Sequence, residues 1–188
     1  MCYHCIVARC IKYMNEDVNM DNDIYYIDKE FLSIIEPIIT NCEFQKMDGI
    51  LHHGISRLNH SLRVAYFSYK ITKALHLDYI ETTQAALLHD FFLDDVDGEN
   101  AIGKLRRHPD CAVNNSLKYF DLNDKQIDII KTHMFPVTFT PPKYLESWIV
   151  DGVDDVAAIY EKFYSLKKEV RAATTFLLIV AVNFIKMR

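Results

Sequence analysis

The stretch Ala85-Ala86-Leu87-Leu88-His89-Asp90 places a histidine and an aspartate directly after four apolar residues. The segment that holds it, residues 79–92, has the apolar content of a helix in a protein core. Residues 94–98 then contain three aspartates and a glycine, which is typical of a polar loop. We therefore expect His89 and Asp90 at the C-terminal end of a helix that opens into an acidic loop.

Helical spacing of apolar residues recurs on both sides of this stretch. Ser56 precedes a segment whose apolar residues lie along one broad face, and serine is a favoured N-cap residue. His108-Pro109 and Asn123-Asp124 mark the expected starts of two later helices. Besides 79–92, the expected helices are 31–39 with a distortion at Pro37, 56–75, 108–120, 125–134, and a long one from Tyr144 past Asp154 toward Phe163.

The composition favours an all-α fold. Half of the 188 residues are apolar, and the chain contains only 5 glycines and 5 prolines, which disfavours a turn-rich β protein. A chain of this length suits one domain with a sizeable core. We expect residues 1–25 to be a poorly ordered N-terminal extension and residues 26–188 to form the domain, with residues 171–188 as its apolar C-terminal helix.

The net charge and the cysteine pattern indicate which binding partners and which cellular compartment to expect. A formal charge of −5 and an isoelectric point near 5.9 provide no basic field for long nucleic acid, so a small substrate is expected. The 5 cysteines have irregular positions and no signal peptide follows Met1, so we expect a cytoplasmic protein. The apolar run 172–185 is shorter than the ~20 residues that cross a bilayer. We expect it to be buried or to face a partner, including a second copy in a homodimer, and not to enter a membrane.

Six histidine and aspartate residues stand near the beginning, the end or the inward face of an expected helix. In chain order they are His60, His89, Asp90, His108, His133 and Asp154. Helices can hold such ligands together at the axis of a bundle. Imidazoles and carboxylates without cysteine suit one or two divalent ions of Mn, Fe, Co, Ni, Zn or Mg.

Three passages resemble the motifs of HD-domain phosphohydrolases. They are NHSLRVA at 59–65, AALLHD at 85–90 and VDGVD at 150–154. The similarity covers roughly residues 51–161, and it implies an all-α HD-domain helical bundle that binds a divalent metal. The ligands implied by the resemblance are His60, His89, Asp90 and Asp154.

The resemblance also implies a second metal ion. His108 and His133 match the two extra histidines of the binuclear branches, which include cyclic-dinucleotide phosphodiesterases and diadenosine tetraphosphatases. The segment 132–136 lacks the His-His and Gly-Tyr-Pro elements of the cyclic-di-GMP enzymes, which argues against that substrate. The chain looks more like small, uncharacterised bacterial HD proteins, although it has Asp155 where these commonly have lysine.

Several roles follow from this resemblance. Asp90, His108 and His133 are the expected catalytic residues, while Asp151 and Asp155 remain alternatives to Asp154 as the last ligand. Basic side chains near the ligands are candidates to bind the substrate phosphate, and each is equally typical of a solvated surface. These basic residues are Arg57, Arg63, Lys104 and Lys131.

The expected function is hydrolysis of a phosphomonoester, phosphoanhydride or phosphodiester bond, in a nucleotide, by a metal-activated hydroxide. This function makes the chain an HD-type metal-dependent hydrolase with a phosphorylated small molecule as its substrate. The alternative is a catalytically weak HD fold that binds a nucleotide and signals through a partner or a dimer. Asp155 and the apolar run 176–182 favour that alternative.

Overall fold

The computed structural model describes residues 28–52, 55–93 and 100–186. Within these ranges the fold is helical apart from two paired strands of two residues each, which confirms the all-α expectation. The expected extension at residues 1–25 and the acidic segment 94–98 lie outside the described residues. The elements are α2 (Lys29–Ile39), α3 (Cys42–Gln45), the 3₁₀ helix η1 (Lys46–Gly49), β1 (Leu51–His52), β2 (Ile55–Ser56), α4 (Arg57–Ala74), α5 (Tyr79–Leu88), α6 (Ala101–Ser116), α7 (Asp124–Thr132) and α8 (Leu145–Lys186).

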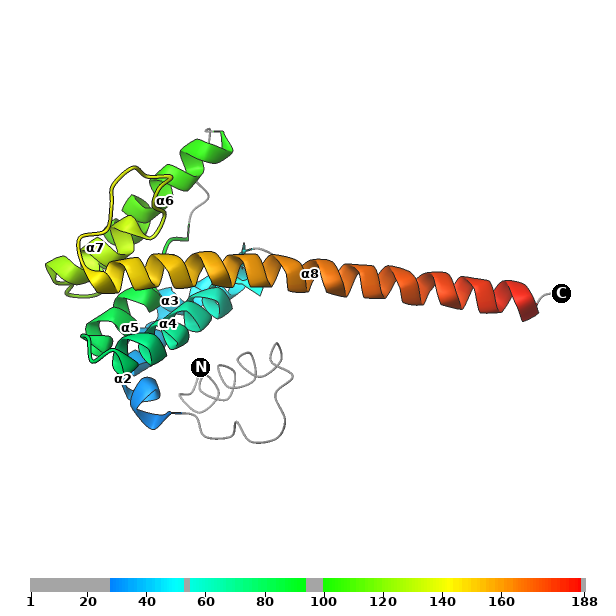
Figure 1. The fold of residues 1–188 in the computed structure, drawn as a ribbon, viewed down its shortest axis with the longest axis horizontal. Coiled ribbons are helices and arrows are strands. Elements are labelled where there is room, and N and C mark those ends of the chain that lie inside the picture. Colours follow the sequence, from blue (N-terminus) through cyan, green and yellow to red (C-terminus); the bar gives the residue numbers. More distant parts are fainter. Residues whose placement is uncertain (1–27, 53–54, 94–99, 187–188) are drawn as a thin grey trace.

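The helices α4 and α5 form the centre of the bundle, with α2, α7 and α8 packed around them (Figure 1). α4 begins where the Ser56 hydroxyl accepts a hydrogen bond from the Asn59 N–H at 3.3 Å, as the sequence predicts. α5 begins in the same way at Asp78, whose carboxylate accepts a bond from the Glu81 N–H at 3.3 Å. These caps satisfy backbone donors that a first helical turn leaves without partners.

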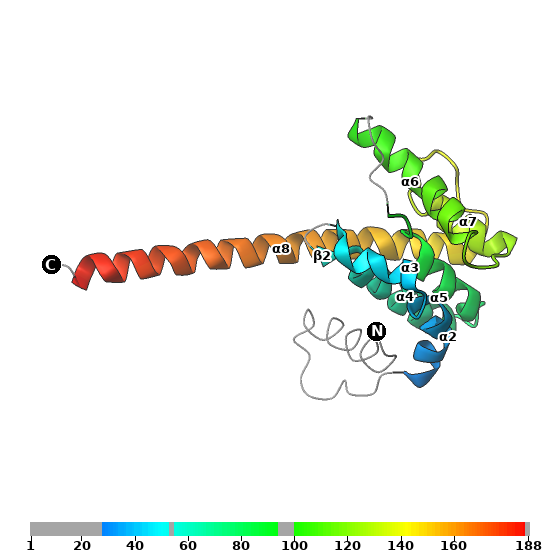
Figure 2. The same cartoon turned by 180° about the vertical axis from the view of Figure 1, so that it is seen from behind.

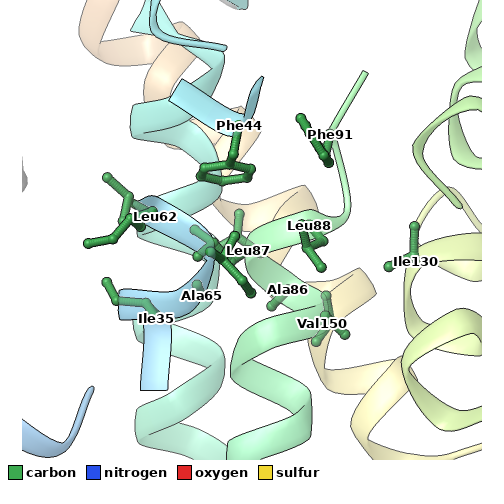
Figure 3. Close-up of a cluster of buried hydrophobic side chains, with 14 of the residues drawn as sticks. Ile35, Phe44, Leu62, Ala65, Ala86, Leu87, Leu88, Phe91, Ile130 and Val150 are labelled. Atoms are coloured by element: carbon green, nitrogen blue, oxygen red, sulfur yellow. The ribbon is translucent and has the colours of Figure 1, made fainter. Parts of the chain in front are cut away.

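Apolar side chains from these helices meet in one core (Figure 3). Ile35 of α2 and Leu87 of α5 are fully buried there. Phe44 and Phe91 pack edge to face with their ring centroids 5.3 Å apart, an arrangement that aromatic pairs prefer. Because Phe91 directly follows Asp90 in the chain, this packing holds the backbone immediately after the His89-Asp90 pair.

The helix α8 lies along the bundle and then continues beyond it (Figures 1 and 2). Val150, Asp154, Ala157 and Glu161 are buried and spaced three or four residues apart, so they form the face of α8 that contacts the bundle. Although α8 has 42 residues, no helix in the described ranges combines the length and apolar content needed to cross a membrane. The expected cytoplasmic location stays a prediction.

The helices α6 and α8 differ most in extent from the expectations, whereas α5 ends at Leu88, four residues before the expected end. The predicted start of a helix at His108 is wrong, because Asn100 caps α6 earlier by accepting a hydrogen bond from the Gly103 N–H at 2.9 Å. Pro109 therefore lies inside α6, a position that its missing N–H normally disfavours. α8 continues past Phe163 to Lys186, since residues 163–186 contain no glycine or proline that would end it.

Replacing Leu87 with alanine tests the central position of α5. The side chain is 0% exposed, so the change leaves a cavity in the core, and we expect the free energy of unfolding to fall by about 2–5 kcal/mol. Urea denaturation followed by circular dichroism measures this loss. The control is Leu75→Ala at the exposed end of α4, for which we expect a change within about 0.5 kcal/mol. Equal effects of the two substitutions would contradict the described core.

Candidate metal centre

The six histidine and aspartate residues singled out in the sequence come together inside the bundle. Each is at most 8% exposed, although all are polar. Buried groups of this kind need partners, and these six side chains lie close enough to be partners for one another. His60 lies on α4, His89 and Asp90 at the end of α5, His108 on α6, His133 at the end of α7, and Asp154 on α8.

His89 and His133 are held in the same way at two helix ends. Each is the C-cap residue of its helix, where backbone carbonyl groups lack partners within the helix. The Nδ1–H of His89 donates to the Ala86 carbonyl at 2.7 Å, and that of His133 donates to the Ile130 carbonyl at 2.7 Å. These bonds fix the orientation of both rings, so that Nε2 of each points into the cluster.

Asp154 forms one side of the cluster. Its Oδ1 atom lies 2.8 Å from His60 Nε2 and 3.5 Å from His89 Nε2. The contact with His60 joins α8 to α4, and the contact with His89 joins α8 to α5. Asp154 is therefore the aspartate of the VDGVD passage that reaches the histidines.

Asp90 lies between the two sides of the cluster. Its Oδ2 atom is 3.8 Å from His89 Nε2, whereas its Oδ1 atom is 3.6 Å from His108 Nε2 and 3.8 Å from His133 Nε2. One carboxylate thus faces His89 with one oxygen and the two later histidines with the other. This is the geometry of a carboxylate that could be shared by two cations.

The chemistry of these side chains fits a divalent cation. Three sets have ligand atoms within 4.8 Å of one another, and they are His60/His89/Asp90, His89/His133/Asp154 and Asp90/His108/His133. His89 Nε2 is buried and has no hydrogen-bond partner among the described residues, which is costly for a polar atom unless an ion binds it. His133 Nε2 carries a lone pair, because its Nδ1–H donates to Ile130, and it lies 2.8 Å from His108 Nε2, whose N–H donates to it when no cation is bound. A cation beside these two atoms would take the place of that proton.

The two later histidines are neutral. Burial lowers the pKa of His108 to about 3, and the nearby His133 adds to this effect. Burial also lowers the pKa of His133, with a further contribution from the charge of His89. Neutral imidazole is the form that binds metal ions, so these two rings are prepared as ligands at neutral pH.

The other side of the centre is charged. Burial lowers the pKa of His60, but hydrogen bonds to Asp154 and Glu161 outweigh it and raise the pKa to about 10. Burial likewise lowers the pKa of His89, while the charges of Asp90 and Asp154 raise it above its ordinary value. Burial raises the pKa of Asp154, yet His89 and His60 hold it well below the usual range. A bound cation would take the place of the imidazole protons here.

Glu161 is a member of this cluster that sequence reasoning missed. Its Oε2 atom lies 2.9 Å from His60 Nδ1, and its Oε1 atom accepts a hydrogen bond from Arg63. It orients His60 so that Nε2 faces Asp154, as carboxylates commonly do for metal-binding histidines. The only signal in the sequence is that Glu161 follows Asp154 by two helical turns, a spacing that surface glutamates share.

The remaining candidates occupy different environments. Arg57 is buried, donates to the Phe92 carbonyl at 2.6 Å and lies over the Phe92 ring. Lys131 is exposed and 3.5 Å from Asp110, and Lys104 is half-buried on α6, one turn before His108. Phosphate binding by these residues and by Arg63 stays a prediction. Of the alternative ligands, Asp155 is exposed, and Asp151 is buried with its pKa raised to about 7 by burial and by Asp155.

The comparison with protein families agrees with this arrangement. The HD domain model matches residues 57–159, which is more than half of the 188 residues. The chain therefore belongs to the HD domain family, and it has the fold of metal-dependent phosphohydrolases. The searches of curated proteins and of solved structures found no significant match. The similarity to small bacterial HD proteins stays a prediction.

Replacing Glu161 with glutamine keeps its size but removes the charge that orients His60. We expect the affinity for Mn²⁺ to fall about 10- to 100-fold, as is typical when a histidine ligand loses its carboxylate partner. Isothermal titration calorimetry on metal-free protein measures this. Glu146→Gln is the matched control, because Glu146 is also buried on α8 but lies 3.0 Å from Lys125. Unchanged affinity in Glu161→Gln would show that Glu161 does not support the site.

Proposed function

We propose that this protein hydrolyses a phosphomonoester, phosphoanhydride or phosphodiester bond of a nucleotide with the help of one or two divalent cations. The main support for this proposal is the buried cluster in which Asp90 lies between two sets of histidines. Such a cluster of imidazoles and carboxylates without thiolates suits Mn, Fe, Co, Ni, Zn or Mg. The HD domain match is consistent with this reaction class and leaves the substrate open.

The ligand atoms divide into two groups. His60, His89 and Asp154 with one oxygen of Asp90 would hold a first cation, and the other oxygen of Asp90 with His108 and His133 would hold a second. A cation there lowers the pKa of a water molecule and neutralises charge on the phosphoryl oxygens. Glu161 supports the first group because it holds the His60 ring from its other side.

The substrate is proposed to approach beside His108 and Asp154. These two residues are each 8% exposed, whereas the other four are at most 2% exposed. The His108 ring stacks on Phe92 with an interplanar angle of 19°, so its orientation is set. Asp90, His108 and His133 are the proposed catalytic residues, because Asp90 Oδ1 lies 3.6 Å from His108 Nε2 and 3.8 Å from His133 Nε2, and the three would hold a cation that activates the attacking water.

Phosphate binding requires positive side chains close to this opening. Lys104 precedes His108 by one turn of α6 and is the best placed of the four candidates, since its side chain is half-buried and on the same helix face. Arg57 instead contacts Phe92, which in turn contacts His108, so we propose a positioning role for Arg57.

Metal content tests the two groups of ligands. We expect about two divalent ions per chain after purification without chelator and about one in His108→Ala, because the change removes a ligand of the second group only. Elemental analysis of the purified proteins measures this. His76→Ala is a control, since His76 lies at the end of α4 outside the cluster. One ion in both wild type and His108→Ala would assign His108 and His133 to supporting roles.

Catalysis is tested on a panel of nucleotide monophosphates, triphosphates and dinucleotides. We expect release of phosphate or mononucleotide that is abolished by a chelator and restored by Mn²⁺. His89→Ala should lose activity by at least about 10²-fold, since it removes a central ligand. Activity that survives full metal removal would exclude the proposed reaction. Nucleotide binding without turnover, at full metal content, would instead favour the catalytically weak signalling module.

A further inference from the structure

The helix α8 has a second face, opposite to the one that contacts the bundle. At about 100° per residue, Val156, Ile159 and Phe163 lie roughly 140–200° around the helix from the buried Asp154. The apolar residues of this face that have described side chains and are exposed are Leu145, Val156, Ile159, Phe163 and Leu166, at 55% to 68% exposure. Exposed apolar residues in a row of this kind mark an interaction surface.

The row keeps one spacing over the whole helix. The intervals alternate strictly between four and three residues, which is the heptad spacing of a helix that packs against another helix. Its positions are 145, 149, 152, 156, 159, 163, 166, 170, 173, 177, 180 and 184, and the residues there are Leu, Ile, Gly, Val, Ile, Phe, Leu, Val, Ala, Leu, Val and Phe. We call these twelve positions the α8 seam. Gly152, the smallest of them, has open space around it, so a partner helix can approach closely.

The second half of α8 needs a covering element. Glu161 is the last buried residue of the helix among those with described side chains, and Figures 1 and 2 show the helix continuing well beyond the bundle. Residues 162–186 extend about 37 Å at 1.5 Å per residue. A solitary helix with an apolar sequence is unstable in water, because most helical stability comes from packing of an apolar face.

We infer that a second copy of this chain covers the seam, with the two α8 helices antiparallel. The charges beside the seam select this orientation. In an antiparallel pair centred between residues 163 and 166, Lys162 of each copy stands opposite Glu169 of the other. In a parallel pair, Lys162 would stand opposite Lys167 of the other copy, and the two cations would repel each other.

This register pairs the seam along its entire length. Phe163 meets Leu166 at the centre, and Phe184 of one copy meets Leu145 of the other at the ends. The second half of each helix therefore lies along the first half of the other, on the side away from the bundle. The register uses nearly the full span of α8, since the centre of the pair lies about one residue from the centre of the helix at residues 145–186.

Introducing a charge at the centre of the seam tests the dimer. We expect the full-length wild type to sediment as a dimer at micromolar concentration. We expect Phe163→Asp to sediment as a monomer with a smaller helical circular dichroism signal, because residues 162–186 then lose the helix that covers them. Tyr164→Asp is the matched control, because Tyr164 is the next aromatic residue on the exposed surface but lies outside the seam, and it should remain dimeric. A monomeric wild type, or a Phe163→Asp variant that stays dimeric, would overturn the inference. So would a monomer that floats with phosphatidylcholine or phosphatidylserine vesicles, since this would assign the seam to lipid.

Charge reversal tests the orientation. In the antiparallel pair, Lys162→Glu and Glu169→Lys each create two like-charge contacts, and we expect either change to raise the dimer dissociation constant about tenfold. The double variant restores opposite charges and should return the constant to within about twofold of wild type. Tighter association of Lys162→Glu than of the wild type would overturn the antiparallel arrangement, because that change relieves repulsion only in a parallel pair.

Discussion

Asp154 contacts the imidazoles of His60 and His89 inside the bundle, and this interaction joins three helices through one carboxylate. Removing one member of such a buried pair leaves a charge without a partner, which typically costs about 3–5 kcal/mol. The interaction is therefore a constraint on packing as well as on chemistry. The carboxylate and the two rings together help to hold α8 against α4 and α5. Glu161 adds a second connection between α8 and α4 through the other nitrogen of His60.

The cluster breaks the rule that a core is apolar, and the reasons are local. Two histidines end their helices and use Nδ1 to satisfy backbone carbonyls, which leaves Nε2 for the centre. Asp90 follows His89 directly in the chain, and the packing of Phe91 against Phe44 fixes the backbone next to Asp90. Proteins depart from consistent core packing mainly at functional sites. The buried Nε2 of His89, which has no hydrogen-bond partner in the part of the chain that the structure describes, is such a departure.

The helix α8 has two tasks on opposite faces. The inner face carries Asp154 and Glu161 into the cluster, and the outer face carries the α8 seam. A helix that is held on both faces is a stiffer support for ligands than one held on a single face, and rigid supports keep a site at its working geometry. Pairing through the seam would thus stabilise the same helix that completes the centre, although the two faces share no side chain.

The sequence by itself determined the helical class, the cap at Ser56, the capping pair at Asn123 and the order of the six clustered residues, because these depend on local spacing and local hydrogen bonds. The sequence did not decide whether Asp151, Asp154 or Asp155 is the last member of the cluster. It also contained no clear sign that Glu161 belongs to it. Only the tertiary structure decided these points, since His60 and Asp154 are separated by 94 positions in the chain and meet through the packing of α4 against α8. The start of α6 was also known only from the structure. Asn100 caps this helix, and the helix continues through Pro109, where the sequence predicted its start. Local patterns specify which face of a helix is apolar, whereas the way the helices pack specifies which polar side chains from distant segments come within contact distance.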